Sequence, residues 1–148
     1  MAYFMTSFSL IDAAEHDKQF IFDAFKLSMR DYVDWAWGWD DEFQHTGFWR
    51  NLQVQNFKLI CIGEEPAGAI YVQEGEQSHW VRTLFLLPEF QRRGIGSTLL
   101  AQEAIRAKNL NKKLVLTVIK INPAKRLYDR MGFSVIDEDR VSYHMELG

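Results

Sequence analysis

One uninterrupted stretch limits the fold of this chain more than any other: an apolar segment, a short basic loop and an amphipathic segment, in that order. Residues 84–87 are apolar at every position, which is typical of a strand buried on both faces in the middle of a sheet. The loop after Pro88 contains an arginine pair and two glycines, and a helix is predicted over residues 94–109. The stretch therefore predicts a strand, a tight loop and a helix that begins directly after it.

This loop has the chemistry of an anion-binding site. The first N–H groups of a helix lack partners within the helix, and the helix dipole makes that end positive. Gly94 and Gly96 have no Cβ, so a phosphate group can approach the backbone closely. Arg92 and Arg93 add positive charge beside the same N–H groups. These residues favour a diphosphate-binding loop; the alternative is an ordinary connection with a surface arginine pair.

Two well-known phosphate-binding patterns do not match the loop. The P-loop pattern GxxxxGK[ST] occurs nowhere in the chain. The dinucleotide pattern requires a glycine three residues after Gly96, where this chain has Leu99. What remains is the run QRRGIG at residues 91–96.

Length and composition exclude several classes of protein. The 148 residues suit a single domain, residues 1–148, with a proper hydrophobic core, and the net charge of −3 argues against a general nucleic-acid-binding protein. The single cysteine, Cys61, lies in an apolar run and is expected in the core. No segment has the length and apolar character of a membrane span, and no basic N-terminal signal region is present. We therefore expect a cytoplasmic protein without membrane or nucleic-acid partners.

Residues 32–44 combine three tryptophans with four carboxylates. One interpretation is a pocket for an amine acceptor, because aromatic faces and carboxylates both attract a cation. Its candidate residues are Trp35, Trp39, Asp40 and Glu42, together with His79 at the start of the long strand. The other interpretation is core aromatics together with acidic residues that favour the positive first turn of a helix.

The remaining pattern predicts alternating strands and helices. Asp12 and Glu15 are spaced as a capping box, so a helix is expected from Asp12 to a break at Gly38. A second helix is expected from Asp40 to about residue 52, and the helix at 94–109 should bury Ile95, Leu99, Ala104 and Ile105 or nearby positions. The predicted strands are residues 7–11, 57–62, 68–73, 79–87, 113–119, 133–137 and 140–147.

A second motif lies about thirty residues after the loop. In the run NPAKRLYDRMGF, Asn122 and Pro123 predict a helix start, Gly132 predicts its end, and Phe133 can pack back onto it. The run resembles the N-x-x-A/K-x-x-x-Y-x-x-x-G-F segment of the GCN5-related N-acetyltransferase (GNAT) family. QRRGIG resembles that family's Q/R-x-x-G-x-G/A signature, and residues 86–90 are similar to its V-x-P-x-[YF] lead-in. The resemblance covers the chain from about residue 57 to the end, and the N-terminal helices moderately.

The resemblance implies a fold of the α/β (α+β) class. It is a mixed, mostly antiparallel sheet of six to seven strands, with a central parallel strand pair that splays apart and helices on both faces. The strands at 79–87 and 113–119 would be the parallel pair, because the helix between them makes a βαβ unit.

The resemblance also implies acetyl-CoA as donor. The backbone of the strand end would pair with the pantetheine arm, the loop N–H groups would hold the diphosphate, and the Asn122 side chain would contact the same cofactor. The cofactor-binding residues implied in this way are Leu84, Phe85, Leu86, Gln91, Arg92, Arg93, Gly94, Ile95, Gly96, Ser97 and Asn122.

By the same resemblance, a neutral amine attacks the thioester directly, and a backbone N–H near Leu86 stabilises the oxyanion. Tyr128 matches the family's tyrosine near the sulfur and is the candidate general acid. Reference pKa values of about 10 for a phenol and about 8.5 for a thiol are close enough for proton transfer. The alternative is that Tyr128 is a core aromatic on its helix.

The general base stays open. Some family members have a glutamate on the long strand, where this chain has Val81, Arg82, Thr83 and Leu84. His79, Glu42, Asp40 or an ordered water chain are the candidates, and His45 and His144 have no better claim. The histidines show no metal-ligand spacing, so no metal is expected.

The expected function is an acetyl-CoA-dependent N-acetyltransferase that acts on a primary amine of a small molecule or a protein. The alternative is a non-catalytic acyl-CoA-binding or interaction module on the same fold, which the absent strand glutamate favours. The sequence leaves open the acceptor, an acyl group longer than acetyl, and the oligomeric state. The aromatic-rich closing strands could support a homodimer.

Overall fold

The computed structural model describes residues 7–148 of the chain. The strands are β1 Ser9–Asp12, β2 Phe57–Ile62, β3 Glu65–Glu74, β4 Ser78–Leu86, β5 Lys113–Ile119, β6 Ser134–Glu138 and β7 Ser142–Leu147. The α-helices are α1 Lys18–Trp37, α2 Asp41–Gln44, α3 Ile95–Asn109 and α4 Ala124–Met131. Short 3₁₀ turns cover Glu15–Asp17, Val54–Asn56 and Pro88–Phe90, and a π-helical turn covers His45–Trp49.

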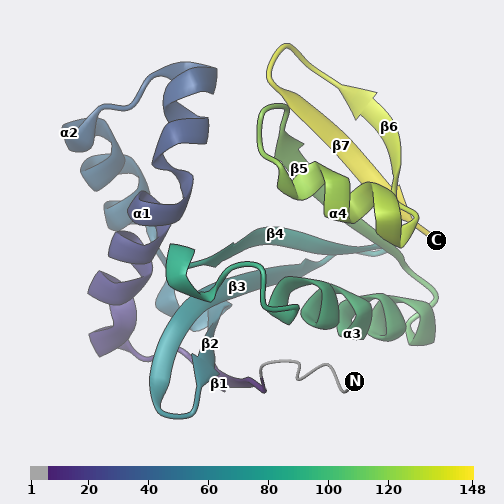
Figure 1. Ribbon diagram of the computed structural model, residues 1–148, viewed down its shortest axis with the longest axis horizontal. Coiled ribbons are helices and arrows are strands. Elements are labelled where there is room, and N and C mark those ends of the chain that lie inside the picture. Colours follow the sequence, from purple (N-terminus) through teal and green to yellow (C-terminus); the bar gives the residue numbers. More distant parts are fainter. Residues whose placement is uncertain (1–6) are drawn as a thin grey trace. The chain divides into compact units, whose positions relative to one another are not determined.

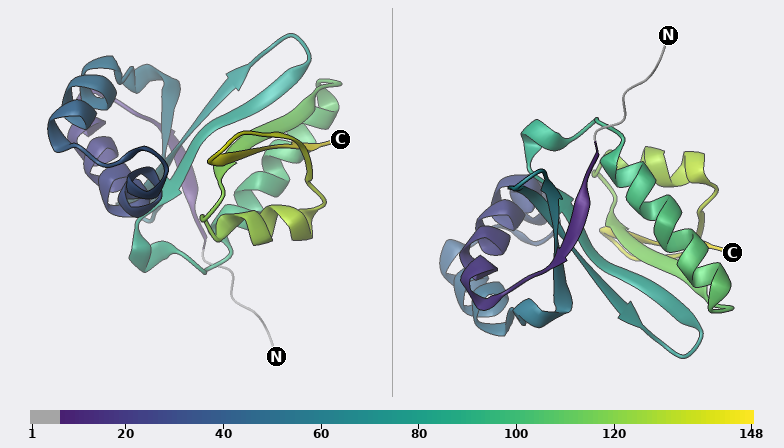
Figure 2. Two further views of the ribbon diagram at one scale, coloured as in Figure 1. Left: turned by 90° about the horizontal axis from the view of Figure 1, so that it is seen from above. Right: turned by 90° about the horizontal axis from the view of Figure 1, so that it is seen from below.

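The strands form one seven-stranded sheet in the order β1-β2-β3-β4-β5-β7-β6 (Figures 1 and 2). The β4–β5 pair is parallel, and the β1–β2, β2–β3, β5–β7 and β6–β7 pairs are antiparallel. Helix α3 connects the parallel strands, which is the crossover that a parallel pair requires. This mixed, mostly antiparallel sheet with its central parallel pair confirms the fold class expected from the sequence.

The chain forms two compact units that interleave along the sequence. Among the described residues, the first unit comprises residues 7–71 and 83–96, and the second comprises residues 72–82 and 97–148. Strands β3 and β4 each contribute residues to both units, so neither unit is a continuous segment of chain.

The core of the first unit lies between α1 and strands β2 to β4. Phe25 stacks face to face on Phe48 with ring centroids 4.2 Å apart, and Cys61 is buried, as the apolar run around it predicted. Aromatic pairs add about 1 kcal/mol beyond their burial. The buried residues of this cluster are Ile21, Ala24, Val54, Phe57, Leu59, Cys61, Ala69 and Phe85.

The predicted helix start at Asp12 is wrong. Asp12 is the last residue of β1 and pairs with Lys58 of β2, because strand pairing takes precedence over the local capping pattern. The capping interaction lies further along the chain, where Asp17 Oδ2 accepts a hydrogen bond from the Ala14 N–H at 2.8 Å. Helix α1 therefore begins at Lys18 and ends, as predicted, just before Gly38.

The second helix begins as predicted. Asp40 Oδ1 accepts a hydrogen bond from the Phe43 N–H at 2.9 Å and so caps α2. The helical backbone continues through the π-helical turn and ends at Asn51. The loop between β2 and β3 is shorter than predicted, because β3 begins at Glu65 and a bulge at Ile60 and Cys61 adjusts the register.

Helix α3 buries Ile95 and Leu99, as predicted, but the rest of its buried stripe differs from the prediction. Ile95, Leu99 and Ala107 are buried, but Ile105 is 61% exposed. The buried stripe passes instead through Glu103, a carboxylate that is only 3% exposed. Glu103 occupies the i, i+4 position between Leu99 and Ala107, so the helix periodicity places it on the buried face.

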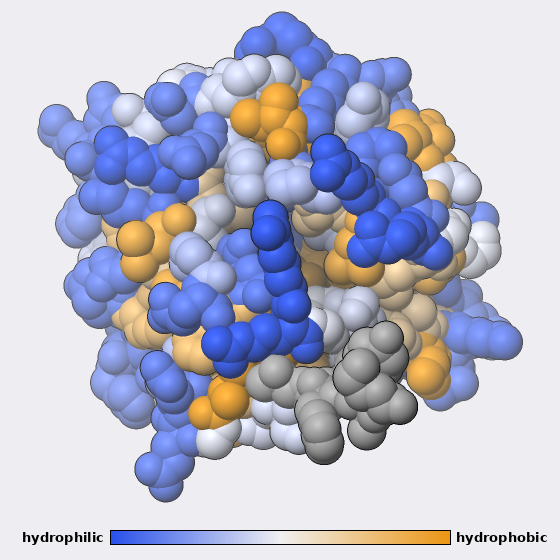
Figure 3. Space-filling model, in the orientation of Figure 1, coloured by the Kyte–Doolittle hydropathy of each residue, from blue (hydrophilic) through white to orange (hydrophobic). Residues whose placement is uncertain are grey.

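On the face shown in Figure 3, apolar side chains are scattered among polar ones rather than gathered in one continuous patch. Within residues 7–148, none of the helices combines the length and apolar character that crossing a membrane would require.

Candidate active site

The end of β4 is held against β3 at very close range. A Cβ atom at Gly68 of β3 would lie 2.1 Å from the Phe85 carbonyl oxygen and 2.9 Å from the Leu86 Cα, so only glycine fits there. The Leu87 N–H continues the contact by donating to the Ala67 carbonyl oxygen at 2.8 Å. A glycine inside a strand often marks such a close backbone approach.

The parallel ladder between β4 and β5 covers four residue pairs. It begins with Ser78 opposite Lys113 and ends with Val81 opposite Leu116. Strand β4 itself continues to Leu86, so its last five residues, 82–86, lie beyond this ladder. The predicted pantetheine-binding residues Leu84, Phe85 and Leu86 belong to this part of the strand.

The loop after β4 has an unusual backbone. Arg92 has a φ of 62° and Gly94 a φ of 80°, so two left-handed residues flank Arg93. Left-handed residues in tight turns gather successive backbone N–H groups into a concave anion-binding nest. The Gln91 side chain connects the loop to the end of β4, because its Nε2 donates a hydrogen bond to the Leu86 carbonyl oxygen at 2.9 Å.

The charges around the loop suit an anion. Helix α3 has no acidic residue in its first turn, which Ile95, Gly96 and Ser97 form, and it carries Arg106 and Lys108 in its last turn. This distribution follows the helix dipole and leaves the positive N-terminal end without an acidic neighbour on the helix. Arg92 and Arg93 are exposed, and the Arg93 guanidinium lies 5.2 Å from the centre of the Phe90 ring.

The second motif folds as its residues predicted. Asn122 Oδ1 accepts a hydrogen bond from the Ala124 N–H at 2.9 Å, so its side chain caps α4 and this role requires no cofactor. Gly132 ends the helix with a φ of 99°. Phe133 is buried and its ring lies 5.8 Å from that of Tyr128, which confirms that it packs back onto the helix.

Tyr128 lies in the middle of α4, and burial raises the pKa of its phenol to about 12. The phenol therefore stays protonated throughout the physiological range. Tyr128 is better suited to donating a hydrogen bond to a developing negative charge than to losing its proton early.

Two of the predicted acceptor-pocket residues, Trp39 and Asp40, have structural partners within the first unit. The Trp39 indole Nε1 donates to Asp41 Oδ1 at 2.7 Å, and Asp40 caps α2. Hydrogen bonds from Trp39 and Lys26 lower the pKa of Asp41. Trp35, on α1, is 48% exposed, and Glu42 lies exposed in the first turn of α2.

A surface pocket of about 460 Å³ lies beside these residues, within the volume range of small-molecule sites. Asp40 is the predicted residue that lines it, and Trp37 and Phe43, 63% and 68% exposed, are aromatic linings that the sequence interpretation did not select. The complete lining is Val33, Trp37, Gly38, Asp40, Phe43 and Gln44.

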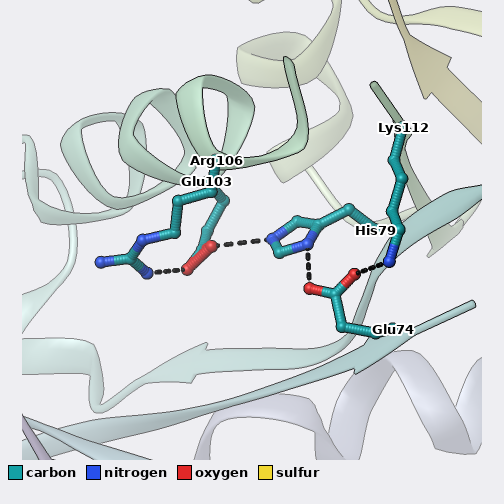
Figure 4. A network of polar contacts seen from close by, with 5 residues as sticks. All are labelled: Glu74, His79, Glu103, Arg106 and Lys112. Carbon is teal, nitrogen blue, oxygen red and sulfur yellow. Dashed lines mark hydrogen bonds and ion pairs between the residues drawn. The ribbon is translucent and has the colours of Figure 1, made fainter. Parts of the chain in front are cut away.

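His79 lies in a buried polar network of the second unit (Figure 4). Its Nε2 is 2.9 Å from Glu103 Oε2, and its Nδ1 contacts a carboxylate oxygen of Glu74, as an ion-pair contact rather than an aligned hydrogen bond. Arg106 donates to Glu103 at 2.6 Å, and Lys112 donates to Glu74 at 2.9 Å. His79 is only 3% exposed, and both of its ring nitrogens already contact carboxylates.

Charges compete at the exposed end of this network. Burial raises the pKa of Glu74, but the hydrogen bond from Lys112 and the nearby His79 outweigh it, so the net pKa is lowered. Within the described part of the chain, no group of three or more His, Cys, Asp or Glu side chains is arranged to hold a metal ion.

The comparisons with known proteins show the family to which the chain belongs. The chain matches the model of the family described as an acetyltransferase (GNAT) domain over residues 40–147, which is more than half of its length. The chain therefore belongs to the GNAT acetyltransferase family. No curated protein matches the chain by sequence.

Solved structures share the fold over nearly the whole chain. The PaiA N-acetyltransferase of Thermoplasma acidophilum, solved with coenzyme A, has a TM-score of 0.74 at 20% identity and covers 95% of this chain and 98% of that chain. An acetyltransferase of Thermus thermophilus has a TM-score of 0.75 at 19% identity, covering 99% of both chains. Arabidopsis thaliana Naa50, solved with the bisubstrate analogue CoA-Ac-MVNAL, has a TM-score of 0.65 at 19% identity, covering 96% and 99%.

Proposed function

We propose that this protein is an acetyl-CoA-dependent N-acetyltransferase that acts on a primary amine. The observation that carries the proposal is the loop at the start of α3, where left-handed Arg92 and Gly94 flank Arg93 beside a helix end without acidic residues. Acetyl-CoA supplies the acetyl thioester. The loop, with the first turn of α3, holds its diphosphate by backbone N–H groups and arginine charge.

The end of β4 binds the pantetheine arm in this proposal. Residues 84–86 lie beyond the β4–β5 ladder, and Gly68 and Gln91 fix the backbone at Phe85 and Leu86. A fixed backbone can present an N–H near Leu86 to the carbonyl oxygen on which negative charge develops, without reorganising during the reaction.

The acceptor of the proposed reaction is an amine that reaches the donor as a neutral nucleophile. One structural neighbour was solved with coenzyme A and another with the bisubstrate analogue CoA-Ac-MVNAL, which supports a coenzyme A donor and makes a peptide amine one candidate acceptor. The pocket lined by Trp37, Asp40 and Phe43 supports an acceptor with an apolar part and a positive charge.

Acetyl-CoA binding is the direct test, by thermal unfolding of the protein at increasing donor concentration. At 100-fold excess over Kd, ligand linkage stabilises the fold by about 2.7 kcal/mol, which predicts a rise in Tm of about 5 °C or more. ADP at equal concentration is the matched control, because it carries the diphosphate without the pantetheine arm and should shift Tm less. No shift with acetyl-CoA at high micromolar concentration would overturn the proposal.

Tyr128→Phe tests the proposed role of the phenol in turnover. We expect kcat to fall about 100-fold, the lower end of what an acid catalyst contributes, while Kd for coenzyme A changes less than threefold. Because its raised pKa keeps Tyr128 protonated, the wild-type rate should show no decline from Tyr128 below about pH 10. Equal losses in kcat and cofactor binding would instead make Tyr128 a packing residue.

The alternative function, a non-catalytic acyl-CoA-binding module, makes a different prediction. It would bind acetyl-CoA and show the same thermal shift, but it would release no thiol with any member of a broad amine panel. Thiol release measured across small amines, amino acids, polyamines and peptides separates the two functions.

A further inference from the structure

The pocket at the junction of α1 and α2 is built from the end of one helix and the start of the next. Val33 and Trp37 are four residues apart on α1, so they lie on the same face of that helix. Gly38 ends α1 with a φ of 81°, and Asp40 and Phe43 come from the N-cap and the first turn of α2. All of these residues belong to the first unit, so the pocket depends on that unit alone.

Two large aromatic side chains of the pocket are exposed. Trp37 and Phe43 both keep more than half of their surface accessible, although burial of an aromatic ring is strongly favourable. Within residues 7–148, neither ring stacks on another aromatic ring, whereas Phe25 and Phe48 stack face to face in the core of the same unit. Exposed aromatic rings that line one pocket indicate a binding surface rather than a part of the core.

Other tryptophans of the first unit already have a cation over their rings. The Arg30 guanidinium lies 5.8 Å from the ring centre of Trp39, and Lys18 Nζ lies 4.7 Å from that of Trp49. Such pairs are cation–π interactions, in which a positive charge is attracted to the electron-rich face of the ring. Among the described residues, no side chain provides such a cation for Trp37, so its ring face is available to a cation from a ligand.

The charges at this end of α1 favour a cation. The last turn of α1 carries no basic residue, so no side chain there neutralises the negative end of the helix dipole. Asp40 contributes a carboxylate to the pocket wall, and no lysine or arginine of the described chain pairs with it. Lys26 pairs instead with Asp41 at 3.1 Å, and Glu42 is a further acidic residue in the first turn of α2. Negative charge therefore predominates around the pocket.

We propose that this pocket binds an organic ammonium ion, with the apolar groups of the cation against Trp37 and Phe43 and its charge beside Asp40. Aromatic walls of this kind recognise alkylated and quaternary ammonium ions, because these ions combine a positive charge with apolar surface. The volume of about 460 Å³ is sufficient for a small organic cation.

The bound cation is not the nitrogen that is acetylated. A carboxylate beside an ammonium ion favours its charged form and raises its pKa, whereas attack on the thioester requires a neutral amine. A quaternary ammonium ion has no lone pair and does not react at all. The cation is therefore either a second charged group of the acceptor or a separate ligand. The first source deepens the proposed acetyltransferase function and rests on it.

Aromatic contacts connect the pocket side of α1 to the end of β4. The ring centre of Phe25 is 6.1 Å from that of Trp39 and 6.0 Å from that of Phe85. Trp39 directly precedes Asp40, and Phe85 belongs to the proposed pantetheine-binding end of β4. The pocket and the proposed donor site thus share one aromatic cluster of the first unit, which favours the acceptor as the source of the cation.

Choline and its neutral analogue 3,3-dimethyl-1-butanol test the charge selectivity of the pocket. The two molecules have nearly the same shape, but the alcohol has a carbon in place of the ammonium nitrogen. Choline should shift the ¹⁵N–¹H signal of the Trp37 indole saturably. The alcohol should bind at least about fivefold more weakly, because it lacks the cation–π and carboxylate attraction. Equal affinity for the two, or no saturable shift at high millimolar choline, would overturn the proposal.

Substitutions separate the carboxylate from the aromatic wall. Asp40→Asn removes the charge but keeps an N-cap for α2, because asparagine caps helices as well as aspartate does. It should weaken choline binding about threefold, the scale of an exposed charge pair, and leave binding of the alcohol unchanged. Saturation-transfer NMR of the choline methyl protons measures both affinities.

Trp37→Ala should weaken choline binding at least about fivefold in the same measurement. Trp35→Ala is the matched control, since Trp35 is exposed on the same helix but does not line the pocket. An equal loss in the two variants would contradict the assignment of the cation to this pocket.

Inhibition kinetics identify the source of the cation. Competition of choline with the acceptor amine, but not with acetyl-CoA, would assign the pocket to a second charged group of the acceptor. Choline binding that leaves KM for the amine unchanged would assign it to a separate ligand, and either pattern supports the cation site. The two proposals fail separately, because choline binding requires neither acetyl-CoA nor turnover. Turnover without choline binding would overturn this inference and leave the acetyltransferase standing.

Discussion

The residue with the least expected backbone lies in the middle of the loop proposed to bind the diphosphate. Arg92 has a φ of 62°, a conformation that L-residues other than glycine adopt at a cost of about 1 to 2 kcal/mol. The sequence offers glycine two residues later, where Gly94 takes up the second left-handed position. A glycine would adopt this conformation without strain. The arginine found here indicates that the positive charge of its side chain matters more at this position than the strain energy of its backbone.

Replacing Arg92 separates its charge from its backbone. Arg92→Gly and Arg92→Ala lose the same positive charge, so both should weaken acetyl-CoA binding to a similar extent. Arg92→Gly relieves the left-handed strain, so its free energy of unfolding should exceed that of Arg92→Ala by about 1 kcal/mol. Urea unfolding of both variants measures the difference, and an Arg92→Ala variant as stable as Arg92→Gly would show that the position is unstrained.

At the scale of elements, α3 connects the proposed diphosphate-binding loop to a buried polar network. Its N-terminal turn directly follows the proposed diphosphate-binding loop, and Glu103 on its buried face contacts His79 and Arg106. Glu74 and Lys112 extend this network to β3 and to the segment before β5. The network therefore ties the helix that begins at the loop to three neighbouring segments of the second unit (Figure 4).

Replacing Glu103 should show how much this buried network contributes to the free energy of unfolding. Glu103→Ala leaves His79 with one carboxylate and Arg106 without its partner, and breaking a buried pair in this way costs about 3 to 5 kcal/mol. Gln102→Ala, at an exposed position of the same helix, should change stability by less than about 0.5 kcal/mol. A loss below about 1 kcal/mol for Glu103→Ala, measured by urea unfolding, would contradict a structural role for the network.

At the scale of the whole molecule, the chain passes between its two compact units three times. The boundaries fall inside β3, inside β4 and in the first turn of α3, so continuous elements are shared by both units. If β3 or β4 unfolds in one unit, the hydrogen bonds that the same strand makes in the other unit are weakened as well. We therefore expect the units to unfold together although they are compact separately.

Calorimetry can test this cooperativity. The calorimetric and van't Hoff enthalpies of unfolding should agree, and near- and far-UV circular dichroism should report coincident transitions. Two separated transitions would show that each unit is an independent folding domain, which would also overturn the expectation of a single domain over residues 1–148.

Part of the candidate site could be predicted from local spacing alone. The strand, loop and helix around residues 84–100, and the helix from Asn122 to Gly132, depend on caps, turns and periodicity within short windows. The predictions from local sequence were wrong where strand pairing takes precedence, as at Asp12, which belongs to β1 and does not start a helix. The predicted burial of Ile105 was also wrong, because the apolar periodicity of α3 does not by itself show that the Glu103 carboxylate is buried.

The sequence by itself determined the order of the elements and the motifs that place the chain in its family, because those features are encoded by neighbouring residues. Only the tertiary structure decided which distant side chains meet. His79 lies 24 residues from Glu103, and Thr117 lies 27 residues from His144. Such pairs depend on strand register and on the face a helix presents. A shift of one residue in register would turn Thr117 and His144 away from each other.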